Sequence, residues 1–184
     1  MMKIFIGCSS RKTNFDAFQI EASELATHLA NAGYDLVIGG LGDGGMMGRV
    51  YQAFLDAKRG ITVHTLKEYQ EEVNDKKYTK VEYHRTTFER ALHLYQDADT
   101  ILFLPGGTGS ISELFAMLEE HRTIENTKEI ILYNQNGYYA WVLELLAKLV
   151  QMGFNDTSIF SHIKVFNEQS DVLRYLKEKI KKEG

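Results

Sequence analysis

One segment of this 184-residue chain indicates the fold most clearly. It reads Thr100-Ile-Leu-Phe-Leu104-Pro105-Gly106-Gly107-Thr108-Gly109-Ser110-Ile111-Ser112-Glu113. It passes from an apolar, β-prone run through a glycine-rich turn, which holds the only proline, into a helical pattern. Four apolar residues at helical spacing form one stripe of that helix: Ile111, Leu114, Phe115 and Leu118. A strand, a turn and a helix in this order present backbone N–H groups at a helix N-terminus, where anions bind. The turn is therefore a candidate phosphate site.

The same alternation of apolar runs and helical patterns continues over the whole chain. It predicts strands at 3–7, 35–39, 61–65, 100–104, 129–133 and 163–166, and helices at 15–32, 44–58, 86–98, 110–121, 137–152 and 169–182. Regular βαβ alternation is typical of an α/β fold, here a Rossmann-like doubly wound parallel sheet with helices on both faces. We expect one domain over residues 1–184. The charged, weakly periodic segment 66–84 fits either a mobile flap or a short helix with an edge strand.

Composition narrows the function class. A net charge of −4 gives no overall attraction to nucleic acid or to an anionic membrane, so we expect neither as a partner. The only cysteine, Cys8, cannot form an internal disulfide, which fits a cytoplasmic protein. No apolar run is long enough to span a bilayer. We expect a cytoplasmic protein that captures a small anionic ligand locally.

A second glycine cluster runs from Gly39 to Gly48 and contains a G-x-G-x-x-G pattern, with glycines at 40, 42 and 45. Alone this pattern suggests a nicotinamide-dependent oxidoreductase. However, it follows the second expected strand, and only Glu68 stands near the position of the usual ribose-binding acid. So many glycines exceed what one turn requires, and we attribute them to a ligand close to the backbone. The ligand-binding residues expected at the first two strand ends are Ser9, Ser10, Gly40, Gly42, Gly45 and Gly48.

Three other residue types have both a functional and a structural interpretation. Glu113 can place a carboxylate above the phosphate loop, but Ser110-x-x-Glu113 is also a capping box, in which the carboxylate only satisfies backbone donors. Cys8 at a strand end is more often a small buried hydrophobe than a nucleophile. His84 and His93 offer two imidazoles without a third ligand at metal spacing, so we expect no metal site.

The segment Pro105-Gly-Gly-Thr-Gly-Ser-Ile-Ser-Glu113 resembles the P-G-G-x-G-T-x-x-E signature of the LOG family, the cytokinin-activating phosphoribohydrolases whose bacterial members were long labelled possible lysine decarboxylases. Arg90, fifteen residues before Pro105, stands where the family carries an arginine. Further similarities extend over nearly the whole chain, at Cys8-Ser9-Ser10, Gly45-Met-Met-Gly48, Asn136-Gly-Tyr-Tyr139 and Met152-Gly-Phe154. Two departures are Ala91, where the family has lysine, and Ser110, where it has threonine.

The resemblance implies hydrolysis of the N-glycosidic bond of a nucleoside 5′-monophosphate, a cytokinin riboside 5′-monophosphate or an AMP-like nucleotide, to free base and ribose 5-phosphate. It implies Arg90 and Glu113 as the catalytic residues and no cofactor. A carboxylate beside the anomeric carbon stabilises the positive charge that develops there. The 5′-phosphate is expected on the loop made by Gly106, Gly107, Thr108, Gly109 and Ser110. A non-enzymatic nucleotide or cofactor carrier on the same fold is the alternative.

The resemblance also implies a homodimer with Arg90 near the interface. The sequence gives an independent reason, because the 86–98 helix has more apolar positions than one core-facing stripe uses. These positions are Phe88, Ala91, Leu92, Leu94, Tyr95 and Ala98, and the following helix adds Phe115, Met117 and Leu118. We expect Leu94 to lie at the contact between the subunits.

Overall fold

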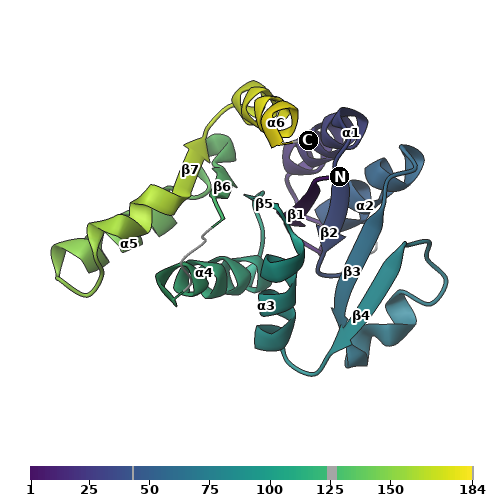
Figure 1. The fold of residues 1–184 in the computed structure, drawn as a ribbon, viewed down its shortest axis with the longest axis horizontal. Coiled ribbons are helices and arrows are strands. Elements are labelled where there is room, and N and C mark those ends of the chain that lie inside the picture. Colours follow the sequence, from purple (N-terminus) through teal and green to yellow (C-terminus); the bar gives the residue numbers. More distant parts are fainter. Residues whose placement is uncertain (43, 124–127, 184) are drawn as a thin grey trace.

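Seven parallel strands form one sheet in the computed structural model, which describes residues 1–42, 44–123 and 128–183 (Figure 1). Their order across the sheet is β4-β3-β2-β1-β5-β6-β7. The strands are β1 Lys3–Gly7, β2 Asp35–Ile38, β3 Ile61–Leu66, β4 Lys80–His84, β5 Thr100–Phe103, β6 Ile130–Tyr133 and β7 Ile163–Phe166. The chain proceeds from β1 to one edge, returns to place β5 beside β1, and then proceeds to the other edge. This confirms the doubly wound parallel sheet. The direction in which successive strands are added reverses between β1 and β5, which makes this the switch point of the sheet.

Helices cover both faces of the sheet. The long ones are α1 Asp16–Ala32, α2 Met46–Asp56, α3 Thr87–Asp97, α4 Thr108–Thr123, α5 Ala140–Gln151 and α6 Gln169–Glu183, and short 3₁₀ helices span Lys67–Glu72, Gln135–Gly137 and Thr157–His162. One buried cluster unites α1, α2 and α6 with the sheet, and the other unites α3, α4 and α5 with its opposite face. Figure 1 shows α3 and α4 together below the sheet and α1 beside α6 above it. No helix of the described residues is long and apolar enough to cross a membrane.

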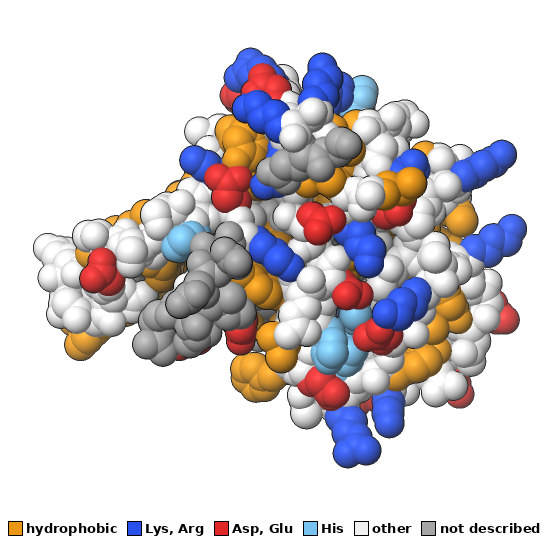
Figure 2. Space-filling view, viewed as in Figure 1, with side chains coloured by type: hydrophobic (Ala, Val, Ile, Leu, Met, Phe, Trp, Pro, Cys, Tyr) orange, Lys and Arg blue, Asp and Glu red, His pale blue; other side chains and the backbone are white. Residues whose placement is uncertain are grey.

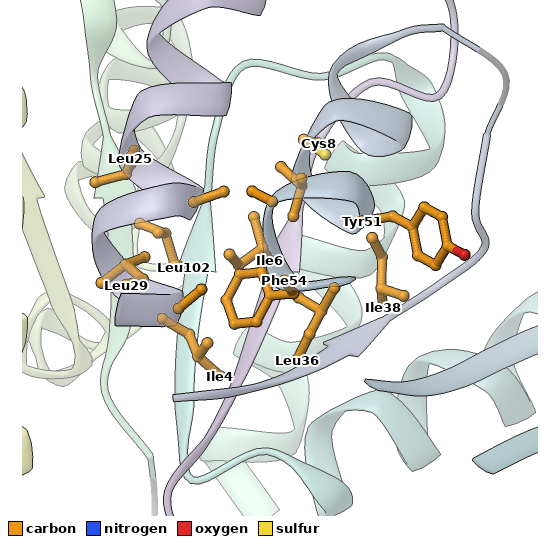
Figure 3. Packing of buried hydrophobic residues seen from close by; sticks show 14 of the residues in the cluster. Ile4, Ile6, Cys8, Leu25, Leu29, Leu36, Ile38, Tyr51, Phe54 and Leu102 are labelled. Atoms are coloured by element: carbon orange, nitrogen blue, oxygen red, sulfur yellow. The ribbon is translucent and has the colours of Figure 1, made fainter. Parts of the chain in front are cut away.

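Alternate residues of each strand enter alternate clusters, as the two-residue repeat of a strand requires. Ile4 and Ile6 of β1 point toward α1 and α2, whereas Phe5 points toward α3 and meets the Phe103 ring edge-on, with 5.5 Å between ring centroids. Figure 3 shows the first of these clusters between strands and helices, including Leu25, Leu29, Leu36, Phe54 and Leu102. Both faces of the central strands β1, β2, β5 and β6 are buried, which explains why their sequences read as continuous apolar runs.

The uncertain 66–84 segment forms the short helix Lys67–Glu72 and the edge strand β4, in agreement with the second of the two expectations for it. β4 pairs in parallel with β3 over five residue pairs, from Thr62 with Lys80 to Leu66 with His84. Its residues are mostly half-exposed, since an edge strand has one neighbour only. This weak burial removed the apolar signal by which the other strands were predicted.

The expected dimer contacts need a correction at α3 and α4. Leu94 and Met117 are completely buried in the chain's own core, and Tyr95 is 2% exposed. Phe88, in contrast, is 76% exposed. The packing of α3 on the sheet therefore uses Leu94, which is not available for contact with another subunit, whereas the side of α3 that carries Phe88 is exposed.

Candidate active site

A cavity of about 700 Å³ lies at the carboxyl ends of β1, β2, β3 and β5, where the sheet changes direction. The strands on either side of the switch lead their loops apart, which leaves room for a ligand. Most of the predicted site residues line this cavity: Ser9, Ser10, Gly40, Gly42, Arg90, Gly107, Thr108, Gly109, Ser110 and Glu113. The structure thus brings together residues from four separate loops and helices.

An ion pair between Arg90 of α3 and Glu113 of α4 forms part of the cavity wall. The Arg90 Nη2 atom donates to Glu113 Oε1 at 2.8 Å, and Nη1 donates to the carbonyl of Gly39 at 3.4 Å. Both side chains are largely buried, at 14% and 11% exposure. Because Arg90 is held by its two neighbours, the carboxylate of Glu113 has a fixed position in the cavity.

The capping-box interpretation of Glu113 is not what the structure shows. Helix α4 begins at Thr108, two residues earlier than expected, and its first turn closes with a bond from the Ile111 amide to the carbonyl of Gly107. Ser110 therefore lies within the helix, and its hydroxyl donates to the carbonyl of Cys8 at 3.1 Å. Glu113 lies in the second turn and is bonded to Arg90, which leaves its carboxylate available for chemistry.

Two opposing effects set the charge of Glu113. Burial raises the pKa of its carboxyl group, and the Arg90 guanidinium, by charge and by hydrogen bond, partly lowers that pKa again. A carboxylate with a raised pKa is a better proton acceptor near neutral pH than an exposed one. The arrangement suits a general base or a group that stabilises a developing positive charge.

Residues 105–110, here called the Pro105 loop, contain three glycines. One of them is packed against neighbouring atoms, and the other two have free space beside them. A Cβ atom on Gly106 would collide with the Ser110 side chain, so this glycine permits the close packing of the loop on α4. A Cβ on Gly107 or Gly109 would meet no atom within 4 Å. These two positions face open space beside the first amides of α4, which have no partner within the helix. An anion can approach them directly.

The second glycine cluster divides in a similar way. Gly40 and Gly42 line the cavity, and Gly42 has a left-handed backbone with φ of +52°. Gly45 and Gly48 pack against the chain itself, because a Cβ on Gly45 would lie 2.6 Å from the carbonyl oxygen of Ser10, and one on Gly48 would lie 3.0 Å from that of Gly42. Gly45 and Gly48 are thus needed because other backbone segments pack closely against them, and they do not line the cavity as predicted.

Arg11, at the end of the first expected strand, also lines the cavity, and three further cavity residues were not singled out from the sequence: Thr65, Tyr69 and Glu72. Thr65 stands near the carboxyl end of β3, so the rule that ligands bind at strand ends could have found it. Tyr69 and Glu72 belong to the short helix Lys67–Glu72, whose weak periodicity gave no signal. This helix brings an aromatic ring and a carboxylate to the side of the cavity opposite the Pro105 loop.

Cys8 lines the same cavity but lacks the character of a nucleophile. It is 3% exposed, and burial together with the nearby negative charge of Glu113 raises the pKa of its thiol far above the usual range. The thiolate is therefore disfavoured, in agreement with the interpretation of Cys8 as a buried hydrophobe.

These features define a class of protein: a doubly wound α/β fold with an arginine–carboxylate pair and two glycine-rich loops at the switch point of its sheet. The family model described as "Possible lysine decarboxylase" matches residues 47–176. The chain belongs to this family, the LOG family that its motifs resemble.

Individual relatives agree with this assignment. The chain is 32% identical over 178 residues to the probable cytokinin riboside 5′-monophosphate phosphoribohydrolase LOG4 of Oryza sativa subsp. japonica. The aligned region covers 95% of this chain and 76% of the relative. The chain is 31% identical over 155 residues to the cytokinin riboside 5′-monophosphate phosphoribohydrolase LOG1 of Arabidopsis thaliana, covering 83% and 71%. Among solved structures, the molybdenum cofactor binding protein of Rippkaea orientalis shares the fold with a TM-score of 0.71 at 17% identity, over 97% of this chain and 96% of that one.

Proposed function

We propose that this chain hydrolyses the N-glycosidic bond of a nucleoside 5′-monophosphate and releases the free base and ribose 5-phosphate. The observation that carries the proposal is the buried pair of Arg90 and Glu113 in the wall of the cavity, beside the open amides of the Pro105 loop. The relatives at about 30% identity are named for this reaction on cytokinin riboside 5′-monophosphates.

The cavity offers a place for each part of the substrate. The 5′-phosphate binds the amides of Gly107 to Ser110, where the α4 dipole favours negative charge. The ribose then lies between this loop and Glu113, and the base extends toward Tyr69, whose ring can stack on it. The phosphate and the base are thus held at opposite sides, which fixes the anomeric carbon near the carboxylate.

Chemistry at the anomeric carbon follows from these positions. The bond between carbon and base nitrogen breaks, the base takes the electron pair, and positive charge develops on the ribose. Glu113 stabilises that charge, orients a water molecule and accepts its proton as the water oxygen bonds to the carbon. Arg90 keeps Glu113 ionised and in position. The proton then passes to the departing base, which balances the reaction.

A carrier of nucleotide or cofactor is the second candidate. The structural neighbour from Rippkaea orientalis is titled a molybdenum cofactor binding protein, and binding loops do not by themselves imply turnover. A carrier needs the glycine loops, whereas it has no need for a buried ion pair beside the sugar. The Arg90–Glu113 pair therefore favours the hydrolase.

The test is to incubate the purified protein with AMP, GMP, CMP, their deoxy forms and isopentenyladenosine 5′-monophosphate, and to measure free base by chromatography. The hydrolase account predicts free base from at least one nucleotide and none from the matching nucleoside. The same panel shows whether a cytokinin or an AMP-like nucleotide is the preferred substrate. Tight binding of every nucleotide without any release of base would favour the carrier.

We also propose that the chain acts as a homodimer in the cytoplasm. The exposed ring of Phe88 borders a hollow of about 580 Å³ between α3 and α4. Four apolar residues line it, Ala91, Leu92, Phe115 and Ala116, together with Ser112 and the acidic residues Glu89, Glu119 and Glu120. A second copy placed over this hollow would bury its apolar side chains. The same α3 carries Arg90, so the interface would lie close to the site.

A further inference from the structure

A cluster of three histidines lies outside the proposed active site. His64 comes from β3, His84 ends β4 and His93 lies on α3. The three rings contact one another, with 5.1 Å between the centroids of His64 and His84, 4.6 Å between those of His84 and His93, and 6.0 Å between those of His64 and His93. His84 and His93 are close in the sequence, and the pairing of β3 with β4 adds His64 as a third imidazole.

Hydrogen bonds decide which ring nitrogens of the cluster carry protons. The Nε2 atom of His64 lies 2.9 Å from Asp97 Oδ2, and its Nδ1 atom lies 2.9 Å from His84 Nε2. An ionised carboxylate only accepts, so His64 donates through Nε2 and its Nδ1 accepts. His84 must then donate through Nε2. In its neutral form His84 therefore has an unprotonated Nδ1, which is the form of imidazole that binds a metal ion.

Two side chains of α3 complete a possible ligand set with His84. Glu89 and His93 are four residues apart, on one side of the helix. One donor atom from each of His84, Glu89 and His93 lies within 4.8 Å of the other two. Glu89 is already fixed, because its Oε2 accepts from the Arg85 amide at 2.8 Å, which leaves its second oxygen for a ligand.

The cluster is open to solvent on the side of α3. Glu89 is exposed and His93 is half-buried, whereas His64 and His84 are buried. Figure 2 shows histidine atoms at the surface where α3 and β4 lie in Figure 1, with acidic side chains beside them. In a single chain, an ion can therefore reach His84, Glu89 and His93, here called the outer group, from solvent.

We propose that His84, Glu89 and His93 bind one divalent transition-metal ion of the zinc class per chain. Two imidazole nitrogens and one carboxylate oxygen suit zinc, cobalt or nickel, with water in the remaining position. The rings of His84 and His93 are 25° apart, so the His93 ring must turn about its Cβ–Cγ bond to aim a nitrogen at the ion, and its half-buried position permits this. Asp97 and His64 act as positioning residues that orient His84.

The outer group is preferred to the neighbouring set of His64, Glu82 and His84, whose donor atoms also lie within 4.8 Å of one another. An ion in that inner set would have to replace the hydrogen bond between His64 and His84 in the buried part of the cluster. An ion in the outer set leaves this bond in place. It joins the end of β4 to α3 and should stabilise their contact.

The experiment uses untagged full-length protein freed of metal with a chelator. Cobalt(II) titration is followed by its visible absorption, and zinc titration by calorimetry, with thermal unfolding measured at each zinc concentration. We expect one ion per chain and a Tm that rises with zinc. His93→Gln and Glu89→Gln should each weaken binding by about a hundredfold or more, since loss of even an outer partner of a ligand costs about 10–100-fold.

Two controls keep the outcome decisive. His28→Gln removes an exposed histidine of α1 and should bind zinc like the unaltered protein. Glutamine at 89 can still accept from the Arg85 amide, so Glu89→Gln keeps the helix start and decides the question alone if His93→Gln fails to fold. Absence of saturable binding, or equal binding by His28→Gln and Glu89→Gln, would overturn the proposal.

Discussion

Replacement of Glu113 by glutamine separates catalysis from packing. Glutamine has nearly the same shape and can still accept a hydrogen bond from Arg90, but it carries no charge to stabilise the ribose and cannot accept a proton from water. We expect kcat to fall on the order of a hundredfold or more, which corresponds to about 2.7 kcal/mol of transition-state stabilisation. KM should change little, because the phosphate contacts are unaffected.

The stability of the same variant has its own expected magnitude. Loss of one partner of a buried ion pair costs about 3–5 kcal/mol when the other charge is left alone. In the unaltered protein Glu113 Oε1 lies 2.8 Å from Arg90, and a glutamine oxygen at the same place can still accept this hydrogen bond. We therefore expect a smaller loss in the free energy of unfolding, about 1–3 kcal/mol, for the weakened hydrogen bond. Release of base gives kcat and KM, and urea unfolding gives the free energy of unfolding.

A matched control is Glu144→Gln on α5. Its carboxylate lies 2.9 Å from Lys148, but the two side chains are 67% and 62% exposed. Water and salt screen an exposed pair, so its loss should change stability little, and we expect activity to be unchanged. If Glu113→Gln kept full turnover and lost only stability, the carboxylate would be structural and the proposed mechanism would be refuted.

Four other outcomes can be measured. Because burial raises the pKa of Glu113 and Arg90 partly lowers it, the acid limb of kcat/KM should lie above the ordinary glutamate range, and Arg90→Gln should move it to still higher pH. The pKa of Glu113 is also higher in the folded state than in the unfolded state, so ionisation of its carboxyl group opposes folding. As pH rises from the unfolded-state pKa through the folded-state pKa, the unaltered protein should therefore lose stability relative to Glu113→Gln. An identical pH dependence of the two proteins would contradict this. Gly107→Ala should fold normally but bind AMP more weakly, whereas Gly106→Ala should lower Tm because of its collision with the α4 side chain; the reverse pattern would show that the open side of the loop is assigned wrongly. Phe88→Asp should give a monomer in light scattering without loss of Tm, and an unchanged mass would exclude this face as the interface.

The sequence predicted the central strands well because both faces of each strand are buried. A buried parallel strand needs apolar residues at every position, so runs such as Thr100-Ile-Leu-Phe-Leu104 stand out from the helices between them. β4 could not be found in the same way, because its residues Lys-Val-Glu-Tyr-His at 80–84 satisfy an exposed edge. The order of the strands also explains why three distant loops were expected to meet.

The site was predicted in part, and the misses have physical causes. The carboxyl-end rule and the family motif located Arg90, Glu113 and the open glycines. Spacing alone could not show that α4 starts at Thr108. This start places Glu113 in the second turn, where it pairs with Arg90 and does not cap the helix. Spacing also could not separate glycines that face a cavity from Gly45, which faces its own chain. The histidine cluster depended on the register between β3 and β4, which local sequence does not reveal.

Proposed hydrolysis in the cavity differs from nucleotide binding alone in the products that it releases. The most direct measurement counts products per protein molecule, by chromatography of free base and an enzymatic assay of ribose 5-phosphate, with the preferred nucleotide in large excess. The account predicts both products in equal amounts, far above one equivalent of protein, from the unaltered chain, and at most about one hundredth of that rate from Glu113→Gln. Nucleotide bound at one equivalent per chain and recovered intact would contradict it.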